Sequence, residues 1–126
     1  MTAVNQIYRC NICGNIVEVR QAGAGELVCC GQPMELLQAN TVEASQEKHV
    51  PVIEVRDDGI MVKIGSMPHP MEAEHYIKWI EYQIDGQNYL QELIPGQRPE
   101  AFFAGAKSGG RASSYCNLHG YWANID

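Results

Sequence analysis

The sequence has no apolar run of about 18 residues, the length that a membrane-spanning helix requires. It also lacks a secretory signal at its start, because the nine residues before Cys10 contain neither an apolar core nor a small-residue cleavage site. With 45% apolar and 19% charged residues among 126, the composition is that of a packed globular protein. We therefore expect a soluble protein of the cytoplasm with no membrane partner.

Positive charge is scarce. Nine Lys and Arg residues are scattered along the chain, against fifteen Asp and Glu, and the net charge is −6. Binding to nucleic-acid phosphates needs clustered Lys and Arg, so we expect no nucleic-acid partner. A negatively charged protein also repels small anions at long range, so an anionic substrate would need a local positive feature.

No stretch shows the apolar period of a long amphipathic helix. From His49 onward the pattern is that of β-strands. Two pairs of strand-like segments flank Asp-Gly turns at residues 57–59 and 85–86, and each pair predicts a hairpin. A further short strand is predicted within residues 95–107, and one closing strand over residues 112–125. Short strands at regular spacing favour an antiparallel β-sandwich.

The five cysteines are unevenly placed, with four in residues 10–30 and the fifth, Cys116, near the end. Disulfides are disfavoured in a reducing cytoplasm, so these thiols are expected to be metal ligands or nucleophiles. The first 37 residues cannot bury enough apolar surface to fold alone, and the cysteines supply a staple. We predict a metal module over residues 1–37, a polar linker over residues 38–46 and a β-domain over residues 47–126.

The first four cysteines have the spacing of an all-sulfur metal site. Cys10 and Cys13 form a Cys-x2-Cys knuckle, and the pair Cys29 and Cys30 follows about fifteen residues later. Such a tetrahedral set holds zinc or iron. Because the second pair is adjacent in sequence, it can reach one ion only by distorting the backbone or the tetrahedron. The spacing alone leaves open a zinc staple and, as a weaker alternative, disulfide pairing.

All four histidines lie in the β-domain together with its single cysteine. Cys116 and His119 are three positions apart and could place a thiolate and an imidazole on one ion across a tight turn. His69 and His75 are six apart, which does not suit one face of a helix, so we expect them in a loop. His49 is expected to open the first strand. One histidine alone is more often a surface or core residue, but four beside one cysteine indicate a metal site.

Several motifs together resemble the desulfoferrodoxins, the two-iron class of superoxide reductase, over essentially the whole chain: CNICGN with CC, EKHVP, HPMEAEHYIKWIE and CNLHGYW. The resemblance implies an all-β homodimer in which a desulforedoxin-like module precedes an immunoglobulin-like antiparallel β-sandwich. It also implies two iron ions per chain. The first would be bound by Cys10, Cys13, Cys29 and Cys30, and the second by His49, His69, His75 and His119 with Cys116 as axial thiolate.

The implied reaction is the one-electron reduction of superoxide to hydrogen peroxide with an external electron donor, usually a small rubredoxin. Five protein ligands on a six-coordinate ion would leave one position open, as a catalytic metal site requires. Four neutral imidazoles and one thiolate on Fe(II) would leave a net positive charge, and Lys48 would add another and attract superoxide. The resemblance further implies that Glu47 occupies the open position once the iron is oxidised.

Two other classes of protein remain open. A rubredoxin-type electron-transfer protein would have no open coordination position and no reaction with superoxide. A zinc-stapled binding module, with sandwich loops that contact a partner, would be colourless. The role of the four-cysteine centre is open as well, because it could relay electrons or only hold the small module and the dimer together.

Overall fold

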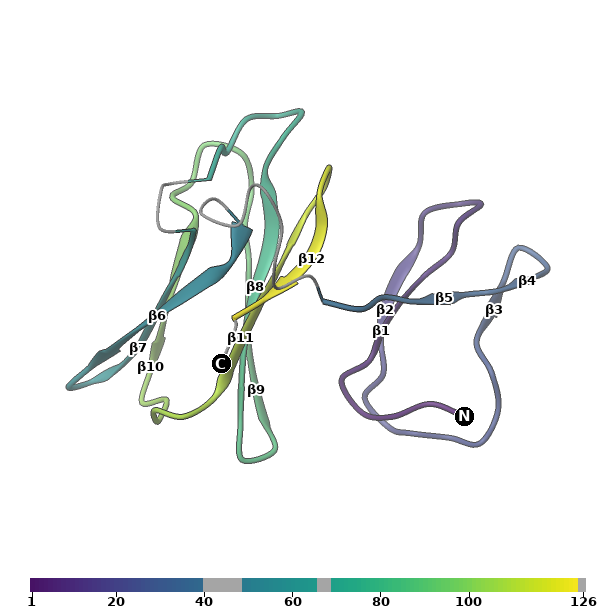
Figure 1. The fold of residues 1–126 in the computed structure, drawn as a ribbon, viewed down its shortest axis with the longest axis horizontal. Coiled ribbons are helices and arrows are strands. Elements are labelled where there is room, and N and C mark those ends of the chain that lie inside the picture. The colour runs from purple at the N-terminus through teal and green to yellow at the C-terminus, as the bar shows by residue number, and fades with distance from the viewer. Residues whose placement is uncertain (40–48, 66–68, 125–126) are drawn as a thin grey trace. The chain divides into compact units, whose positions relative to one another are not determined.

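The computed structural model describes residues 1–39, 49–65 and 69–124. The chain divides into two compact units, Met1–Gln38 and Ala39–Asp126, and each is described by itself. Within the described residues the regular elements are β-strands in antiparallel sheets, which confirms the predicted all-β class (Figure 1). Nearly all of the predicted linker, residues 38–46, lies outside the described residues. No helix in the described ranges is both long and apolar enough to cross a bilayer.

Unit 1 is built from very short strands around a small apolar centre. Its sheet has the order β2-β1-β5, and a separate hairpin joins β3 to β4. Ile7 and Val19 are buried, as is Cys10, whereas Ile12, Val17 and Val28 are exposed. The strands are β1 (Ile7–Arg9), β2 (Ile16–Glu18), β3 (Val28–Cys29), β4 (Gln32–Pro33) and β5 (Glu35–Leu36).

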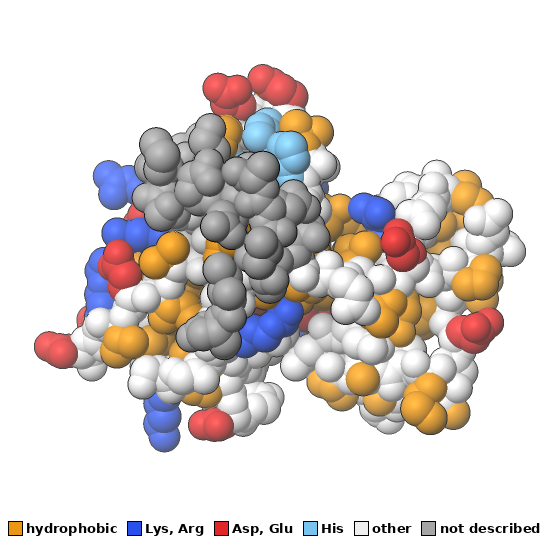
Figure 2. Space-filling view, in the orientation of Figure 1, with side chains coloured by type: hydrophobic (Ala, Val, Ile, Leu, Met, Phe, Trp, Pro, Cys, Tyr) orange, Lys and Arg blue, Asp and Glu red, His pale blue; other side chains and the backbone are white. Residues whose placement is uncertain are grey.

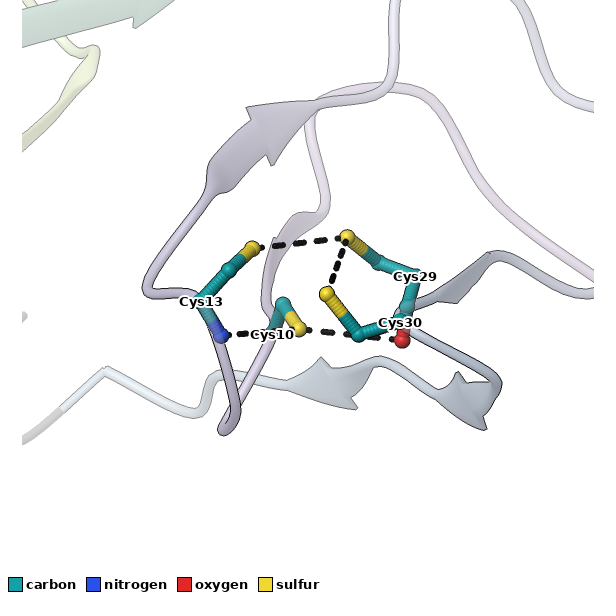
Figure 3. Close-up of side chains that lie close together, drawn as sticks. All are labelled: Cys10, Cys13, Cys29 and Cys30. Atoms are coloured by element: carbon teal, nitrogen blue, oxygen red, sulfur yellow. Dashed lines mark hydrogen bonds between the residues drawn. The ribbon is translucent and has the colours of Figure 1, made fainter.

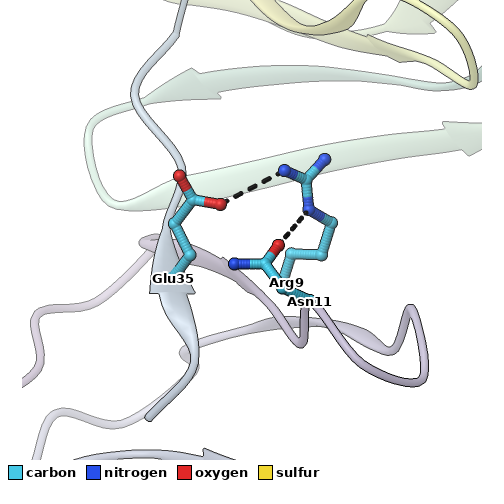
Figure 4. Close-up of polar contacts among 3 residues, drawn as sticks. All are labelled: Arg9, Asn11 and Glu35. Atoms are coloured by element: carbon cyan, nitrogen blue, oxygen red, sulfur yellow. Dashed lines mark hydrogen bonds and ion pairs between the residues drawn. The ribbon is translucent and has the colours of Figure 1, made fainter. Parts of the chain in front are cut away.

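A surface ion pair links two strands of this sheet. Arg9 on β1 lies opposite Glu35 on β5, and its Nη2 donates to a Glu35 carboxylate oxygen at 3.2 Å (Figure 4). The Arg9 Nε also donates to the Asn11 side-chain oxygen at 3.3 Å. Both charged side chains are at least one third exposed, so the pair contributes at most about 1 kcal/mol. Polar contacts of this kind do not replace a core.

Unit 2 contains two antiparallel sheets. One has the order β10-β7-β6 and the other the order β12-β11-β8-β9. Side chains from both sheets form one buried cluster that includes Ile60, Val62, Ile80, Tyr82 and Phe103. This packing confirms the predicted sandwich. The strands are β6 (Pro51–Arg56), β7 (Gly59–Ile64), β8 (Ile77–Ile84), β9 (Gln87–Glu92), β10 (Glu100–Ala104), β11 (Arg111–Cys116) and β12 (Gly120–Ala123).

The two predicted hairpins are present, as β6-β7 and β8-β9. The prediction of a single closing strand over residues 112–125 is wrong, because the segment forms two paired strands, β11 and β12, with a turn between them. Gly120 follows that turn with a φ of 86°, a value that glycine adopts without strain. His49 also does not open a strand. β6 begins at Pro51, a position that tolerates a residue without an N–H.

Candidate metal centres

The four cysteines of unit 1 converge on one point. Cys10 follows β1, Cys13 closes the knuckle, Cys29 ends β3 and Cys30 lies in the turn before β4. Their four sulfur atoms all lie within 4.8 Å of one another (Figure 3). The Cys13 and Cys29 sulfurs are 3.5 Å apart, well beyond the bonded distance of about 2.05 Å, and all four are free thiols. The geometry therefore fits a metal and not a disulfide.

Backbone conformation brings the adjacent pair into this group. Cys30 has a φ of 53°, in the left-handed region, and Gly31 follows with a φ of 77°. For a residue with a Cβ this conformation costs roughly 1–2 kcal/mol. The strain expected from neighbouring cysteines thus lies in the backbone. The knuckle of Cys10 and Cys13 is held by main-chain donors. The Cys13 N–H donates to the Cys10 sulfur at 3.4 Å, and the Gly14 N–H donates to the Cys10 carbonyl at 3.0 Å.

The thiols of this group differ in acidity. Main-chain hydrogen bonds from Cys13 and Ile12 lower the pKa of Cys10 to about 6. Hydrogen bonding with Cys13 and then Cys29 raises the pKa of Cys30 to about 12. Sulfurs this close can share protons, but they cannot all become thiolates without a cation between them. The donor set therefore suits a metal ion that favours the fully deprotonated form.

The second group is assembled from the loops at one end of the sandwich. His49 precedes β6, His69 and His75 lie in the loop before β8, Cys116 ends β11, and His119 lies in the β11-β12 turn. One ligand atom from each of His49, His69, His75 and Cys116 lies within 4.8 Å of the others. The expected loop around His69 and His75 is confirmed, and its tip is closed by a main-chain bond from His75 N–H to the Glu72 carbonyl at 3.1 Å.

The four imidazoles form a near-square. Successive ring centroids are 4.7 Å apart from His49 to His69, 4.8 Å from His69 to His75, 5.1 Å from His75 to His119, and 4.7 Å from His119 back to His49. The diagonal from His49 to His75 is longer, at 6.5 Å. Neighbouring rings are steeply inclined, at 63–82°. Four rings around one centre, with the Cys116 sulfur close to three of them, match a metal site with four nitrogens and one sulfur.

His69 shows how the site suits a metal. Its ring is buried, and its Nδ1–H donates to the Pro70 carbonyl at 2.7 Å, so the other ring nitrogen, Nε2, carries the lone pair. That Nε2 is buried without a hydrogen-bond partner, which is costly unless a ligand binds it. Burial, as the main cause, lowers the pKa of His69 to about 4. The imidazole is therefore neutral at pH 7 and ready to bind a cation.

One side of the second group is enclosed and the other is open. His49, His69 and Cys116 are buried, whereas His119 and Leu118 are exposed. Burial raises the pKa of Cys116, and main-chain hydrogen bonds from Leu118 and His119 act in the opposite direction. Figure 2 shows histidine side chains that reach the surface of unit 2 close to acidic side chains. Among the described residues, His119 thus brings one imidazole of the group into contact with solvent.

Trp122 and Asn117 were not assigned to the site from the sequence. Trp122 is fully buried, stacks on the His49 ring at a centroid distance of 4.8 Å, and donates from Nε1 to the His119 carbonyl at 3.0 Å. It forms a wall of the site beside His49. Asn117 bonds to the loop that carries His75. The predicted residues Glu47 and Lys48 lie outside the described residues, immediately before His49.

Comparison with known proteins agrees with this geometry. A family model described as the desulfoferrodoxin N-terminal domain matches residues 2–37, and one described as desulfoferrodoxin matches residues 41–125. The chain belongs to the desulfoferrodoxin family. Desulfoferrodoxins have a four-cysteine iron centre and an iron centre of four histidines and one cysteine, and the ligand groups for both are present here.

Individual relatives cover most of the chain. A desulfoferrodoxin of Syntrophotalea carbinolica is 56% identical over 119 residues, 94% of each chain. A superoxide reductase of Pyrococcus abyssi is 40% identical over 97 residues, 62% of this chain and 84% of the relative. Among solved structures, the superoxide reductase from Treponema pallidum has a TM-score of 0.74 and 30% identity, and the match covers 95% of this chain and 96% of that one.

Proposed function

We propose that this chain is a superoxide reductase whose catalytic iron is held by His49, His69, His75, His119 and Cys116. The observation that carries the proposal is the near-square of imidazoles beside a buried thiol. Relatives named superoxide reductase support it. A rubredoxin-type carrier or a zinc-stapled module needs only the four-cysteine group, so neither alternative explains the second group.

The chain's own residues supply what the reaction needs from a protein. Superoxide gains one electron and two protons and leaves as hydrogen peroxide. A bound iron supplies the one-electron chemistry, and an external donor restores it. Neutral imidazoles, exemplified by His69, bind without adding charge, and the buried Cys116 supplies a thiolate. The exposed His119 side admits solvent, from which the protons can come.

Lys48 and Glu47 are proposed as the residues that act on the open position. Their support is sequence adjacency, since both directly precede His49, a member of the near-square. A lysine there adds positive charge beside the site in a chain of net charge −6, and this local field favours a small anion. Glu47 would occupy the vacant position in the oxidised state.

The four-cysteine group is proposed to hold an iron through Cys10, Cys13, Cys29 and Cys30. Two roles remain for it, electron relay and structural staple. The small buried centre of unit 1 supports the second role, because so little apolar burial leaves folding dependent on a staple. Retention of superoxide reduction after Cys13→Ser would identify the centre as structural.

We also propose an electron donor, an oligomeric state and a cellular compartment for this chain. The electron donor is a small rubredoxin-like protein. The chain acts as a homodimer in the cytoplasm. Five free thiols, all placed in ligand groups, support a reducing compartment.

Metal analysis combined with a superoxide assay tests the function. Purified protein should contain two irons per chain, show separate visible bands for its two ferric centres, bleach on reduction, and convert superoxide to hydrogen peroxide without releasing dioxygen. Cys116→Ser is the matched variant: it should lose the second band and the activity while keeping the four-cysteine band. A colourless zinc protein, or a coloured one without reaction, would overturn the proposal.

A further inference from the structure

Asn117 lies between Cys116 and Leu118 and bonds across to the other ligand-bearing loop. The Tyr76 N–H donates to the Asn117 Oδ1 at 2.9 Å, and the Asn117 Nδ2 donates to the Glu74 carbonyl at 3.1 Å. The Asn117 main-chain N–H donates to the Tyr76 carbonyl at 3.2 Å. Glu74 and Tyr76, the two partners of the Asn117 side chain, flank His75 on either side. The Asn117 side chain is thus hydrogen-bonded to the backbone on both sides of His75.

Among the described residues, the other hydrogen bonds of the loop that carries His75 lie at its tip and at its base. Its tip is closed internally by the paired main-chain bonds of Glu72 and His75, which fix the loop's shape but not its position. Glu72, Ala73 and Glu74 are exposed. At the base of the loop, the Met71 carbonyl accepts from the Gly96 N–H at 2.8 Å, and the Met71 sulfur accepts from the Ile77 N–H at 3.4 Å. Between that base and the ligand, Asn117 supplies side-chain bonds that join the loop to the β11-β12 turn.

We propose that Asn117 is a positioning residue that sets the place of His75 relative to Cys116 and His119. The proposal rests on the proposed function only in that a metal is bound by these residues. Asparagine suits the role because its side chain offers an acceptor and a donor on one short stem. Aspartate keeps only the acceptor and brings a negative charge against the Glu74 carbonyl, and alanine loses both bonds. The ligand turn is thereby coupled to Tyr76, 41 positions before Asn117 and next to the ligand His75.

A purely structural role predicts a different result, and the chain offers a matched control. Asn124 also links strands through its side chain: its Oδ1 accepts from Ala112 N–H at 2.9 Å, and its main-chain N–H donates to the Ala112 carbonyl at 3.0 Å. It follows the far end of β12, away from the histidines. Asn124→Ala therefore removes a bond between a side chain and the main chain, as Asn117→Ala does, but without touching a ligand loop.

The test uses the iron-loaded full chain and three variants, Asn117→Ala, Asn117→Asp and Asn124→Ala. A chelator is added, and the decay of the second-centre visible band is followed, with the four-cysteine band of the same chain as an internal reference for the amount of loaded protein. We expect Asn117→Ala to release second-centre iron about tenfold faster and to shift the position of its thiolate band. Asn117→Asp should lie between Asn117→Ala and wild type, and Asn124→Ala should match wild type.

Equal release rates for Asn117→Ala and Asn124→Ala would overturn the proposal, as would an unshifted band in Asn117→Ala. If Asn117→Ala does not fold, Asn117→Asp decides by the same criteria. Iron release is read without superoxide, so the two proposals can fail separately. Wild type that binds iron but leaves superoxide intact contradicts only the proposed function.

Discussion

The two units differ in how much their folding depends on bound metal. Unit 1 has strands of two or three residues and buries little besides Ile7, Val19 and Cys10. Unit 2 has strands of four to eight residues and a shared core between two sheets. We therefore expect unit 1 to need its metal ligands for folding. Unit 2 is expected to fold through its own hydrophobic core, with the ligands in the loops at one end of the sandwich. Loss of metal should therefore unfold the first unit and spare the second.

The largest expected effect is the response to ligand removal in unit 1. Cys13→Ser should abolish the four-cysteine band and the hydrogen-exchange protection of residues 1–38, because without its staple the unit has too little buried apolar surface to stay folded. Unit 2 should keep its protection and its second-centre band. Hydrogen exchange with mass spectrometry measures both units in one sample.

Cys116→Ser is the reciprocal variant for that experiment. It removes a ligand from unit 2 but leaves the core of Ile60, Val62 and Ile80 intact, so protection of the sandwich strands should persist. Persistent protection of unit 1 in Cys13→Ser, or loss of sandwich protection in Cys116→Ser, would contradict the contrast between the units.

Replacement of Lys48 by isoleucine tests the role of local charge at the metal centre of unit 2. We expect the bimolecular reaction with superoxide to slow by about tenfold at low salt and its ionic-strength dependence to flatten, because a local positive charge is lost. Pulse radiolysis measures the rate constant. Lys107→Ile is the control, since it removes the same charge from an exposed position of unit 2. A Lys48→Ile rate equal to that of the control would refute electrostatic attraction by Lys48.

We expect the metal-free sandwich to lose stability in mild acid through His69. The folded pKa of His69 is about 4 and its ordinary value is 6.5, with burial as the main cause. Between those values the unfolded chain binds a proton that the folded chain does not. The His69 contribution therefore lowers the free energy of unfolding as the pH falls from about 6.5 to about 4, and it stays constant outside that window.

Urea unfolding of metal-free protein at several pH values measures this contribution. Carboxylates titrate in the same range, so the quantity to compare is the difference between wild type and His69→Gln. That difference should change with pH only inside the window. A difference independent of pH would show that the imidazole is not held neutral by burial.

The smallest expected effect concerns the reduction potential of the four-cysteine centre. The Asn15 Nδ2 donates to the Cys29 sulfur at 3.7 Å. Hydrogen bonds to sulfur stabilise the reduced form, so Asn15→Ala should lower the potential, by a few tens of millivolts at most for a bond of about 0.5–1.5 kcal/mol. Asn11→Ala is the matched control, because the Asn11 side chain bonds to Arg9 and to no sulfur. Redox titration at the four-cysteine band should separate the two variants; equal potentials would remove Asn15 from this role.

Local sequence signals predicted much of the fold. Asp-Gly turns at residues 57–59 and 85–86 set the two hairpins, because few other residue pairs form such tight reversals. The adjacent Cys29 and Cys30 predicted distortion, and Cys30 has left-handed backbone. The β11-β12 turn was missed, because the turn itself contains no glycine or proline and Gly120 comes only after it.

The ligand residues could be named from motifs, but their surroundings could not. Asn117 bonds to residues 41 and 43 positions away, and no spacing within its own motif reveals that partner. Trp122 is one of several aromatic residues in the strands of unit 2. Only the packed structure shows that it stacks on His49. Long-range pairing of this kind depends on sheet register, which the sequence specifies only through the whole fold.

We propose that four imidazoles and one thiolate in unit 2 share a single iron. An anomalous-difference map at the iron absorption edge, from crystals of the purified protein, tests it most directly. We predict two peaks per chain, one among the four cysteines and one bound by all four histidines and the Cys116 sulfur, with a ligand position open to solvent. A second peak that is absent, that lacks the Cys116 sulfur, or that is fully enclosed by protein ligands would contradict the account.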